Sequence, residues 1–144
     1  MFDHFYKYTA AFVDFTRAER QLLENSFTFR QVPRKFVLIS EGKIARELYF
    51  INKGLLRLYY TKDADDITAF IFREHLFAGC HESFLRQAPG NQSLEALEDS
   101  DLLVITYTQL QMLYSKLPKM ERLTRMIAEQ RFINAQAILS SYIL

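Results

Sequence analysis

The stretch that decides the fold is ELYFINKGLLRLYY, residues 47–60. Two short runs rich in Leu, Tyr and Phe flank Gly54, and runs of this kind bounded by turn residues predict strands. Comparable runs recur on both sides of this stretch, at residues 27–31, 36–39, 67–72, 93–97 and 102–106. Short strands spaced by roughly 8–12 residues predict an antiparallel sandwich or barrel. The four glycines all lie in this zone at expected turns, where positive φ is anticipated: Gly42, Gly54, Gly79 and Gly90.

Helices are predicted before the strands. Residues 1–11 carry aromatic side chains at near-helical spacing, and such a stripe is expected to pack on the main body. Thr16 and Glu19 have the spacing of a capping box, which predicts a second helix from Thr16 to about Asn25.

Helices also follow the strands. Residues 107–117 predict one helix that Pro118 ends, and residues 119–142 predict a longer one without internal Gly or Pro. Apolar residues on more than one side of the long helix indicate contact with its own domain and with a second copy. Its basic residues alternate with acidic ones and are expected to form a solvated face: Lys119, Arg122, Arg125 and Arg131.

The composition fits one soluble domain of 144 residues. A net charge of +1 gives no general field for nucleic acid or anionic membrane, and 49% hydrophobic residues suffice for a core. The N-terminus has no signal peptide pattern, and the apolar runs are too short to span a bilayer. Cys80 is the only cysteine, which excludes an intrachain disulfide and is compatible with a cytoplasmic location.

Enzymatic chemistry finds little support in the residues. The three histidines, His4, His75 and His81, lack the spacing of a metal site. Cys80 and His81 are neighbours on a predicted helical turn and point in different directions. No nucleophile elbow, P-loop or dinucleotide fingerprint occurs. Iron–sulfur clusters usually require four thiolates, so the single cysteine argues against one, while a redox role of Cys80 stays open.

The segment FAGCHESFLRQAPGNQSLEALEDS, residues 77–100, predicts a strand end, a glycine, a short helix, a Pro-Gly turn and a strand. Backbone N–H groups in such a loop can converge on a small anion. The charged side chains that an anion would require are not at the expected places. The candidate site therefore depends on whether this loop forms a pocket.

Several motifs resemble the cyclic nucleotide-binding domain, and more narrowly the sensor domain of CRP/FNR-type bacterial transcription regulators. Residues 40–42 (SEG) are similar to the family's turn before its third strand, and residues 48–59 are similar to its L-Y-F-I-x-x-G-x-x-R-L-Y run. Gly79 matches the glycine that opens the phosphate-binding cassette, here residues 79–92, and residues 93–100 resemble the following strands. The resemblance covers nearly the whole chain. It implies a double-stranded β-helix, or jelly roll, with a long C-terminal dimerisation helix.

The departures from the family lie in the cassette. The resemblance implies that Cys80 replaces the Glu that holds the ribose, and that Gly90 and Asn91 replace the phosphate-binding Arg and its small polar neighbour. Without that Arg an enclosed phosphate loses a charge-assisted pair, so ordinary cAMP binding is not expected. Arg86 lies near enough in sequence to reach the pocket. On the long helix the base-contacting positions correspond to Ala135, which cannot hydrogen-bond a base, and Gln136, which can.

These observations predict a mainly β domain with flanking helices, in which residues 1–118 form the β-roll and residues 119–144 the dimerisation helix. We expect the regulatory domain of a CRP/FNR-like regulator that is not an enzyme, has no metal or cofactor, forms a homodimer through residues 119–142, and contacts DNA only through a C-terminal domain not present in this chain. Alternatives are a stand-alone interaction module with a vestigial pocket and, less favoured, a cupin-like metalloenzyme. Whether a different small ligand or none binds stays open. The expected ligand-pocket residues are Gly79, Cys80, His81, Glu82, Ser83, Arg86, Gly90, Asn91, Gln92 and Gln136.

Overall fold

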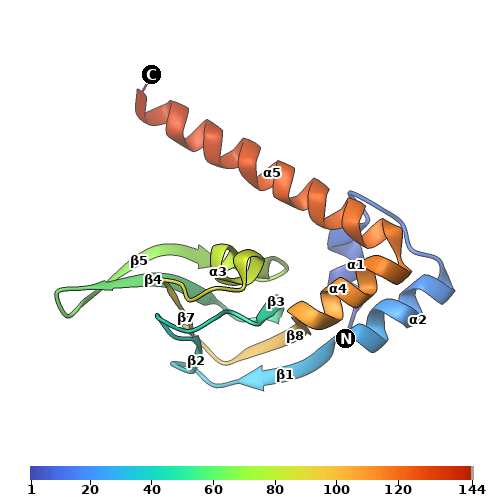
Figure 1. Cartoon of the computed structure of the whole chain (residues 1–144), viewed down its shortest axis with the longest axis horizontal. Helices are drawn as coiled ribbons and strands as arrows, with labels where there is room; N and C mark the ends of the chain where they lie inside the picture. The colour runs from blue at the N-terminus through green and yellow to red at the C-terminus, as the bar shows by residue number, and fades with distance from the viewer. Residues whose placement is uncertain (144) are drawn as a thin grey trace.

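Two four-stranded antiparallel sheets form the centre of the molecule in the computed structural model, which describes residues 1–143. One sheet has the order β1-β8-β3-β6 and the other the order β2-β7-β4-β5. The strands are β1 (Thr28–Val32), β2 (Val37–Ile39), β3 (Glu47–Lys53), β4 (Leu56–Lys62), β5 (Asp65–Phe72), β6 (Phe77–Ala78), β7 (Ser93–Ala96) and β8 (Ser100–Thr106). The predicted jelly roll is confirmed, and the opening stretch supplies the adjacent strands β3 and β4, one for each sheet (Figure 1).

The helices gather at one end of the roll and along one side of it (Figure 1). They are α1 (Asp3–Thr9), α2 (Arg17–Ser26), α3 (His81–Arg86), α4 (Tyr107–Lys116) and α5 (Pro118–Ile143). The capping box predicted for α2 is present, since the Glu19 backbone N–H donates to Thr16 Oγ1 at 3.2 Å and the Thr16 N–H donates to Glu19 Oε1 at 2.8 Å. The aromatic N-terminus packs on the roll as expected, because Phe5 is fully buried with its ring 5.4 Å from that of Phe50.

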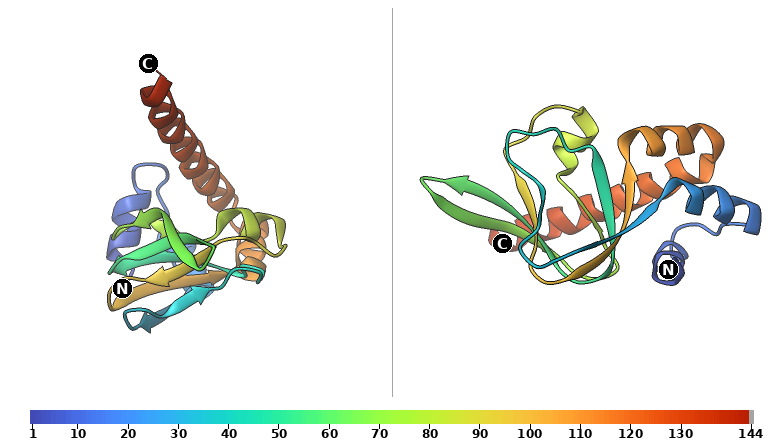
Figure 2. Two further views of the ribbon diagram at one scale, coloured as in Figure 1. Left: turned by 90° about the vertical axis from the view of Figure 1, so that its left-hand side faces the viewer. Right: turned by 90° about the horizontal axis from the view of Figure 1, so that it is seen from below.

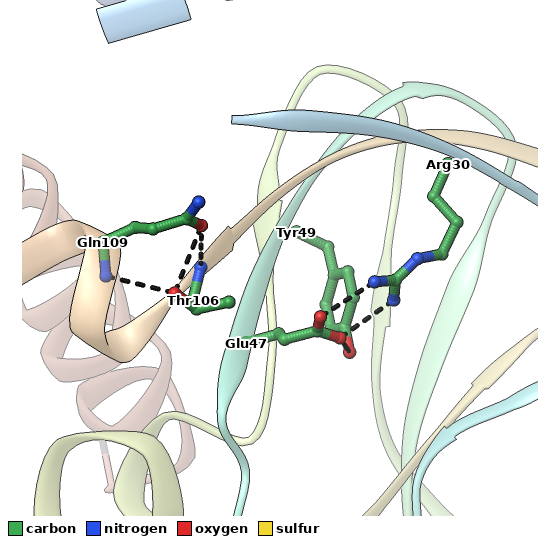
Figure 3. Close-up of polar contacts among 5 residues, drawn as sticks. All are labelled: Arg30, Glu47, Tyr49, Thr106 and Gln109. Atoms are coloured by element: carbon green, nitrogen blue, oxygen red, sulfur yellow. Dashed lines mark hydrogen bonds and ion pairs between the residues drawn. The ribbon is translucent and has the colours of Figure 1, made fainter. Parts of the chain in front are cut away.

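A polar cluster next to α4 connects β1 to β3 across the intervening strand β8 of the first sheet (Figure 3). Arg30 of β1 donates two hydrogen bonds to the carboxylate of Glu47 on β3, at 2.9 and 2.8 Å, and the Tyr49 hydroxyl donates to the same carboxylate at 2.9 Å. Hydrogen bonds from Arg30 hold the pKa of the Glu47 carboxyl below its ordinary value. At the end of β8, Thr106 and Gln109 form a second capping box that starts α4.

Two sequence-based details differ from the structure. The long helix begins at Pro118 instead of residue 119, because proline is well suited to a first helical position, where its missing N–H needs no partner. Of the four glycines only Gly42 and Gly54 have positive φ, so Gly79 and Gly90 are explained by close packing instead. Leu144, the last residue of the predicted dimerisation helix, lies outside the described residues.

The long helix α5 has two different halves. In its first half Met120, Leu123 and Ile127 are buried against the roll and α4. Lys119 fixes its start by donating to Glu19 Oε1 at 2.8 Å. From residue 132 onward every described side chain is exposed, and the C-terminal end stands apart from the roll (Figure 2, left). No helix within residues 1–143 combines the length and apolar character needed to cross a bilayer.

Candidate functional site

The cassette, residues 79–92, folds as a short helix and a loop held against the segment before β3. The Ser83 hydroxyl donates to the Ala88 carbonyl at 2.6 Å and accepts from the Ala45 N–H at 2.9 Å. Gln87 ends α3 in the left-handed conformation, with φ of 50°, and its side chain donates to the Ala45 carbonyl at 2.9 Å. The loop is therefore fixed by the buried Ser83 and the half-buried Gln87, whose side chains bond to backbone.

A pocket of about 340 Å³ lies between α3 and the loop that follows it. The structure brings together seven of the ten expected residues in its wall: Cys80, Glu82, Ser83, Arg86, Gly90, Asn91 and Gln92. Ala88 and Pro89 complete the wall. Gln92 donates to the Tyr60 hydroxyl at 2.7 Å, which joins the pocket to β4 of the second sheet. We call this hollow the cassette pocket.

The backbone around Gly90 is already occupied by hydrogen bonds. Its N–H donates to the Lys43 carbonyl at 3.3 Å, and its carbonyl accepts from the Gly42 N–H at 2.8 Å. A Cβ at position 90 would lie 3.0 Å from the Ser83 Cβ. Position 90 thus has no room for a larger side chain unless Ser83 moves, and its amide is not free for an anion.

The charge in the cassette pocket is balanced and exposed to solvent. Arg86 and Glu82 form an ion pair of 3.6 Å across one helical turn, and their side chains are 74% and 75% exposed. An exposed pair of this kind contributes little and leaves no desolvated cation to hold a phosphate. Within the described chain, Arg86 is the only cationic side chain that lines the cassette pocket.

Cys80 is a buried thiol instead of a reactive one. Burial raises its pKa from 9.0 to about 11, so the thiol is protonated at neutral pH. Its Sγ lies 3.8 Å from the Gln92 carbonyl, a long contact for a weak donor. A nucleophilic or redox cysteine requires a lowered pKa. The side chain therefore fills space beneath the loop.

Three expected residues lie outside the cassette pocket. Gly79 packs beneath the sheet, where a Cβ would lie 2.7 Å from Leu48 Cδ2. Gln136 is exposed on the free half of α5. His81 turns to the opposite side of α3, where its Nε2 lies 3.1 Å from Nη1 of Arg131.

Arg131 was expected on a solvated face, and the structure corrects this. Its guanidinium is partly buried and also donates to the carbonyl of Phe77 on β6. Arginine can only donate, so Nε2 of His81 accepts and the imidazole is neutral. Burial, followed by the Arg131 charge, lowers the pKa of His81 from 6.5 to about 4. This contact joins α5 to the cassette. The sequence signal was its position four residues after the buried Ile127, on the inward stripe.

A metal centre has no counterpart in the described part of the chain. Within residues 1–143 no three His, Cys, Asp or Glu side chains are placed to hold a metal ion together. His4 and His75 stack on each other with ring centroids 4.0 Å apart, and His81 contacts Arg131 instead of either of them.

Comparison with known proteins agrees with the fold. The family model described as "Cyclic nucleotide-binding domain" matches residues 29–116. A curated relative, the "Anaerobic regulatory protein" of Bacillus subtilis (strain 168), is 34% identical over 92 residues. That alignment covers 63% of this chain and 39% of the relative, so the chain spans about two fifths of the curated protein it matches.

Solved structures give the same architecture. A cyclic nucleotide-binding domain from Methylobacillus flagellatus KT superposes with a TM-score of 0.78 at 19% identity, covering 97% of this chain and 83% of the other. The catabolite activator protein of Thermus thermophilus has a TM-score of 0.73 at 22% identity, covering 88% of this chain and 60% of the other. At these identities the likeness concerns the fold.

Proposed function

Because the chain belongs to the family of cyclic nucleotide-binding domains, we propose that it is the sensor and dimerisation domain of a CRP/FNR-like transcription regulator and does not bind ordinary cAMP. The observation that carries the proposal is α5, which is anchored on the roll in its first half and bare in its second. The curated relative is named a regulatory protein, and that role comes to this chain as part of the proposal.

The free half of α5 carries the pattern of a two-stranded coiled coil. Exposed side chains of α5 from residue 128 onward repeat at alternating spacings of four and three residues, which defines the α5 seam: Ala128, Phe132, Ala135, Leu139 and Tyr142. Heptad spacing keeps such a seam facing a partner helix, and two copies of one chain bury it by symmetry. An apolar seam of this length in water favours association. The second copy of the chain is the proposed partner.

Arg131 supports a route from the cassette to the dimer. Its guanidinium bonds to the cassette at His81 and to β6 at Phe77, while the neighbouring Phe132 lies on the α5 seam. A change in the cassette would alter these bonds and shift the population of α5 orientations. In a longer protein that shift would reach an attached DNA-binding domain, the proposed route to DNA.

The cassette pocket supports the exclusion of ordinary cAMP. Loss of one partner of a desolvated charge pair costs roughly 2–5 kcal/mol, which weakens binding by roughly 30- to 5,000-fold. Arg86 does not replace that partner, because it is exposed and already paired with Glu82. The cassette then serves as a structural link, or as the site of a ligand without a cyclic phosphate.

Sedimentation velocity of the purified chain at micromolar concentration tests the dimer. The expected species has twice the 17.0 kDa mass of the chain. Phe132→Glu combined with Leu139→Glu places charges in the α5 seam and is expected to give monomers. A matched control, Gln130→Glu combined with Ser141→Glu, adds the same charge outside the seam and should stay dimeric. A monomeric wild type, or dissociation by both pairs alike, would refute the proposal.

A further inference from the structure

A second, largely apolar cavity of about 320 Å³ lies between the roll and the helices α3, α4 and α5. Its walls come from all of these elements and include Leu48, Phe84, Leu110, Met120 and Ile127. The volume lies at the lower end of the range of ligand sites, about 300–1,000 Å³. It shares no lining residue with the cassette pocket, which is formed by the other side of α3. We call it the helix cavity.

The helix cavity has few polar groups, and only one of them is charged. The Tyr114 hydroxyl donates to Thr124 Oγ1 at 3.0 Å, and Thr124 in turn lies 3.1 Å from the Met120 carbonyl, so this pair is satisfied within the protein. His81 is neutral at pH 7, since burial lowers its pKa to about 4. Arg131 is thus the one formal charge among the lining residues of the described chain.

The charge of Arg131 has no counter-ion within residues 1–143. Its two protein acceptors are the neutral imidazole of His81 and the carbonyl of Phe77. The other arginines that form ion pairs are matched to carboxylates: Arg30 to Glu47, Arg57 to Asp66 and Glu95, Arg86 to Glu82, and Arg125 to Glu129. Burial lowers the pKa of Arg131, which reflects loss of hydration around the charge. A partly buried guanidinium without an anion is costly, and a bound carboxylate would offset that cost.

From this pairing of an apolar chamber with one unmatched guanidinium, we propose that the helix cavity binds a small monocarboxylic acid with an apolar body. The carboxylate lies against Arg131, whose five N–H donors exceed its two protein acceptors and whose planar fork suits a carboxylate. The apolar body lies among the side chains of β3, α4 and α5. An inorganic anion lacks the apolar contacts, and an alcohol of the same length lacks the charge.

The position of the helix cavity connects ligand binding there to the cassette and to α5. The cavity is walled by α3 of the cassette on one side and by the anchored half of α5 on another. A carboxylate on the spare donors of Arg131 shares the guanidinium with His81 and Phe77 and places a negative charge beside both of them. Binding there changes the link between the cassette and α5 without any ligand in the cassette pocket.

Octanoate is a suitable probe. As controls, 1-octanol keeps the apolar chain without the charge, and acetate keeps the carboxylate without the long chain. Calorimetric titration of the wild-type chain should give saturable binding of octanoate, and neither 1-octanol nor acetate should bind comparably. Arg131→Gln should weaken octanoate by roughly 10- to 100-fold, the usual worth of a charge-assisted pair. Arg125→Gln, on the same helix but exposed and paired with Glu129, should leave the affinity unchanged.

If Arg131→Gln unfolds, the site is tested on the wild type instead, by measuring nuclear Overhauser effects between bound octanoate and the protein. Contacts are expected between the octanoate chain and the methyl groups of Leu48 and Ile127. Absence of binding up to millimolar octanoate, equal binding of 1-octanol, or contacts confined to the exposed seam residue Leu139 would each overturn the site. The dimer can fail its own test without affecting any of these readouts.

Discussion

His81 gives the molecule a specific sensitivity to acid. Its folded pKa is about 4 against an ordinary 6.5. At pH 5.0 the unfolded chain therefore binds nearly a full proton at this residue while the folded chain binds about a tenth of one. Since the unfolded state binds more protons, this residue's contribution is intact above pH 6.5 and decreases as pH falls toward 4. The two pKa values give a loss of about 2 kcal/mol between pH 7.5 and pH 5.0.

Urea unfolding of the wild type and of His81→Gln at both pH values isolates this contribution. Glutamine still accepts from Arg131 but does not titrate. Glu19 and Glu47, whose carboxyl pKa values are lowered by hydrogen bonds from Lys119 and Arg30, add acid sensitivity to both proteins equally. The wild type is expected to lose about 2 kcal/mol more than the variant. An equal loss in both proteins would show that His81 is not held neutral by burial and by Arg131.

Further predictions concern the cassette and the turns. Ser83→Ala leaves the Ala45 N–H and the Ala88 carbonyl without their partner and should cost roughly 2 kcal/mol or more of unfolding free energy, against under about 0.5 for the exposed Ser115→Ala. Gly54 has a φ of +116°, and a Cβ at this position would lie 2.1 Å from Ser100 Oγ. Gly54→Ala should therefore lose roughly 2–5 kcal/mol of unfolding free energy. Gly42→Ala, also at positive φ but with open space around it, should lose only about 1–2 kcal/mol. Urea unfolding measures all four, and equal losses for the two glycines would contradict the packing argument.

The roll was predictable because its signals are local. Alternating or aromatic runs between turn residues define the strands, and the capping box at Thr16 fixes the start of α2 within one turn of chain. The boundary at Pro118 was misjudged by one residue, because proline is compatible with the first turn of a helix as well as with the end of the preceding one.

The candidate site was predictable only in part. The order of turn residues in the cassette and its resemblance to the family identified most of the cassette pocket, since its wall comes from one short segment of the sequence. The side of α3 to which His81 turns depends on Arg131, fifty residues later, and no local pattern encodes that contact. The space requirement of Gly90 likewise depends on Ser83 across the loop.

The role of the long helix illustrates the same limit. Charge alternation suggested that Arg131 faces solvent, but its register with Ile127 places it on the inward side. A basic residue on a buried stripe is expensive unless it has partners. Arg131 has such partners, His81 and Phe77, and they lie at the junction between the cassette and α5.

Calorimetric titration of the purified chain with cAMP tests the central claim most directly, because the claim is that the cassette keeps the family's frame without its phosphate anchor. The account predicts a dissociation constant weaker than about 30 µM, the mildest outcome of losing the anchor from a micromolar site. Binding tighter than that, weakened in turn by Arg86→Gln, would show that Arg86 enters the cassette pocket and would contradict the account.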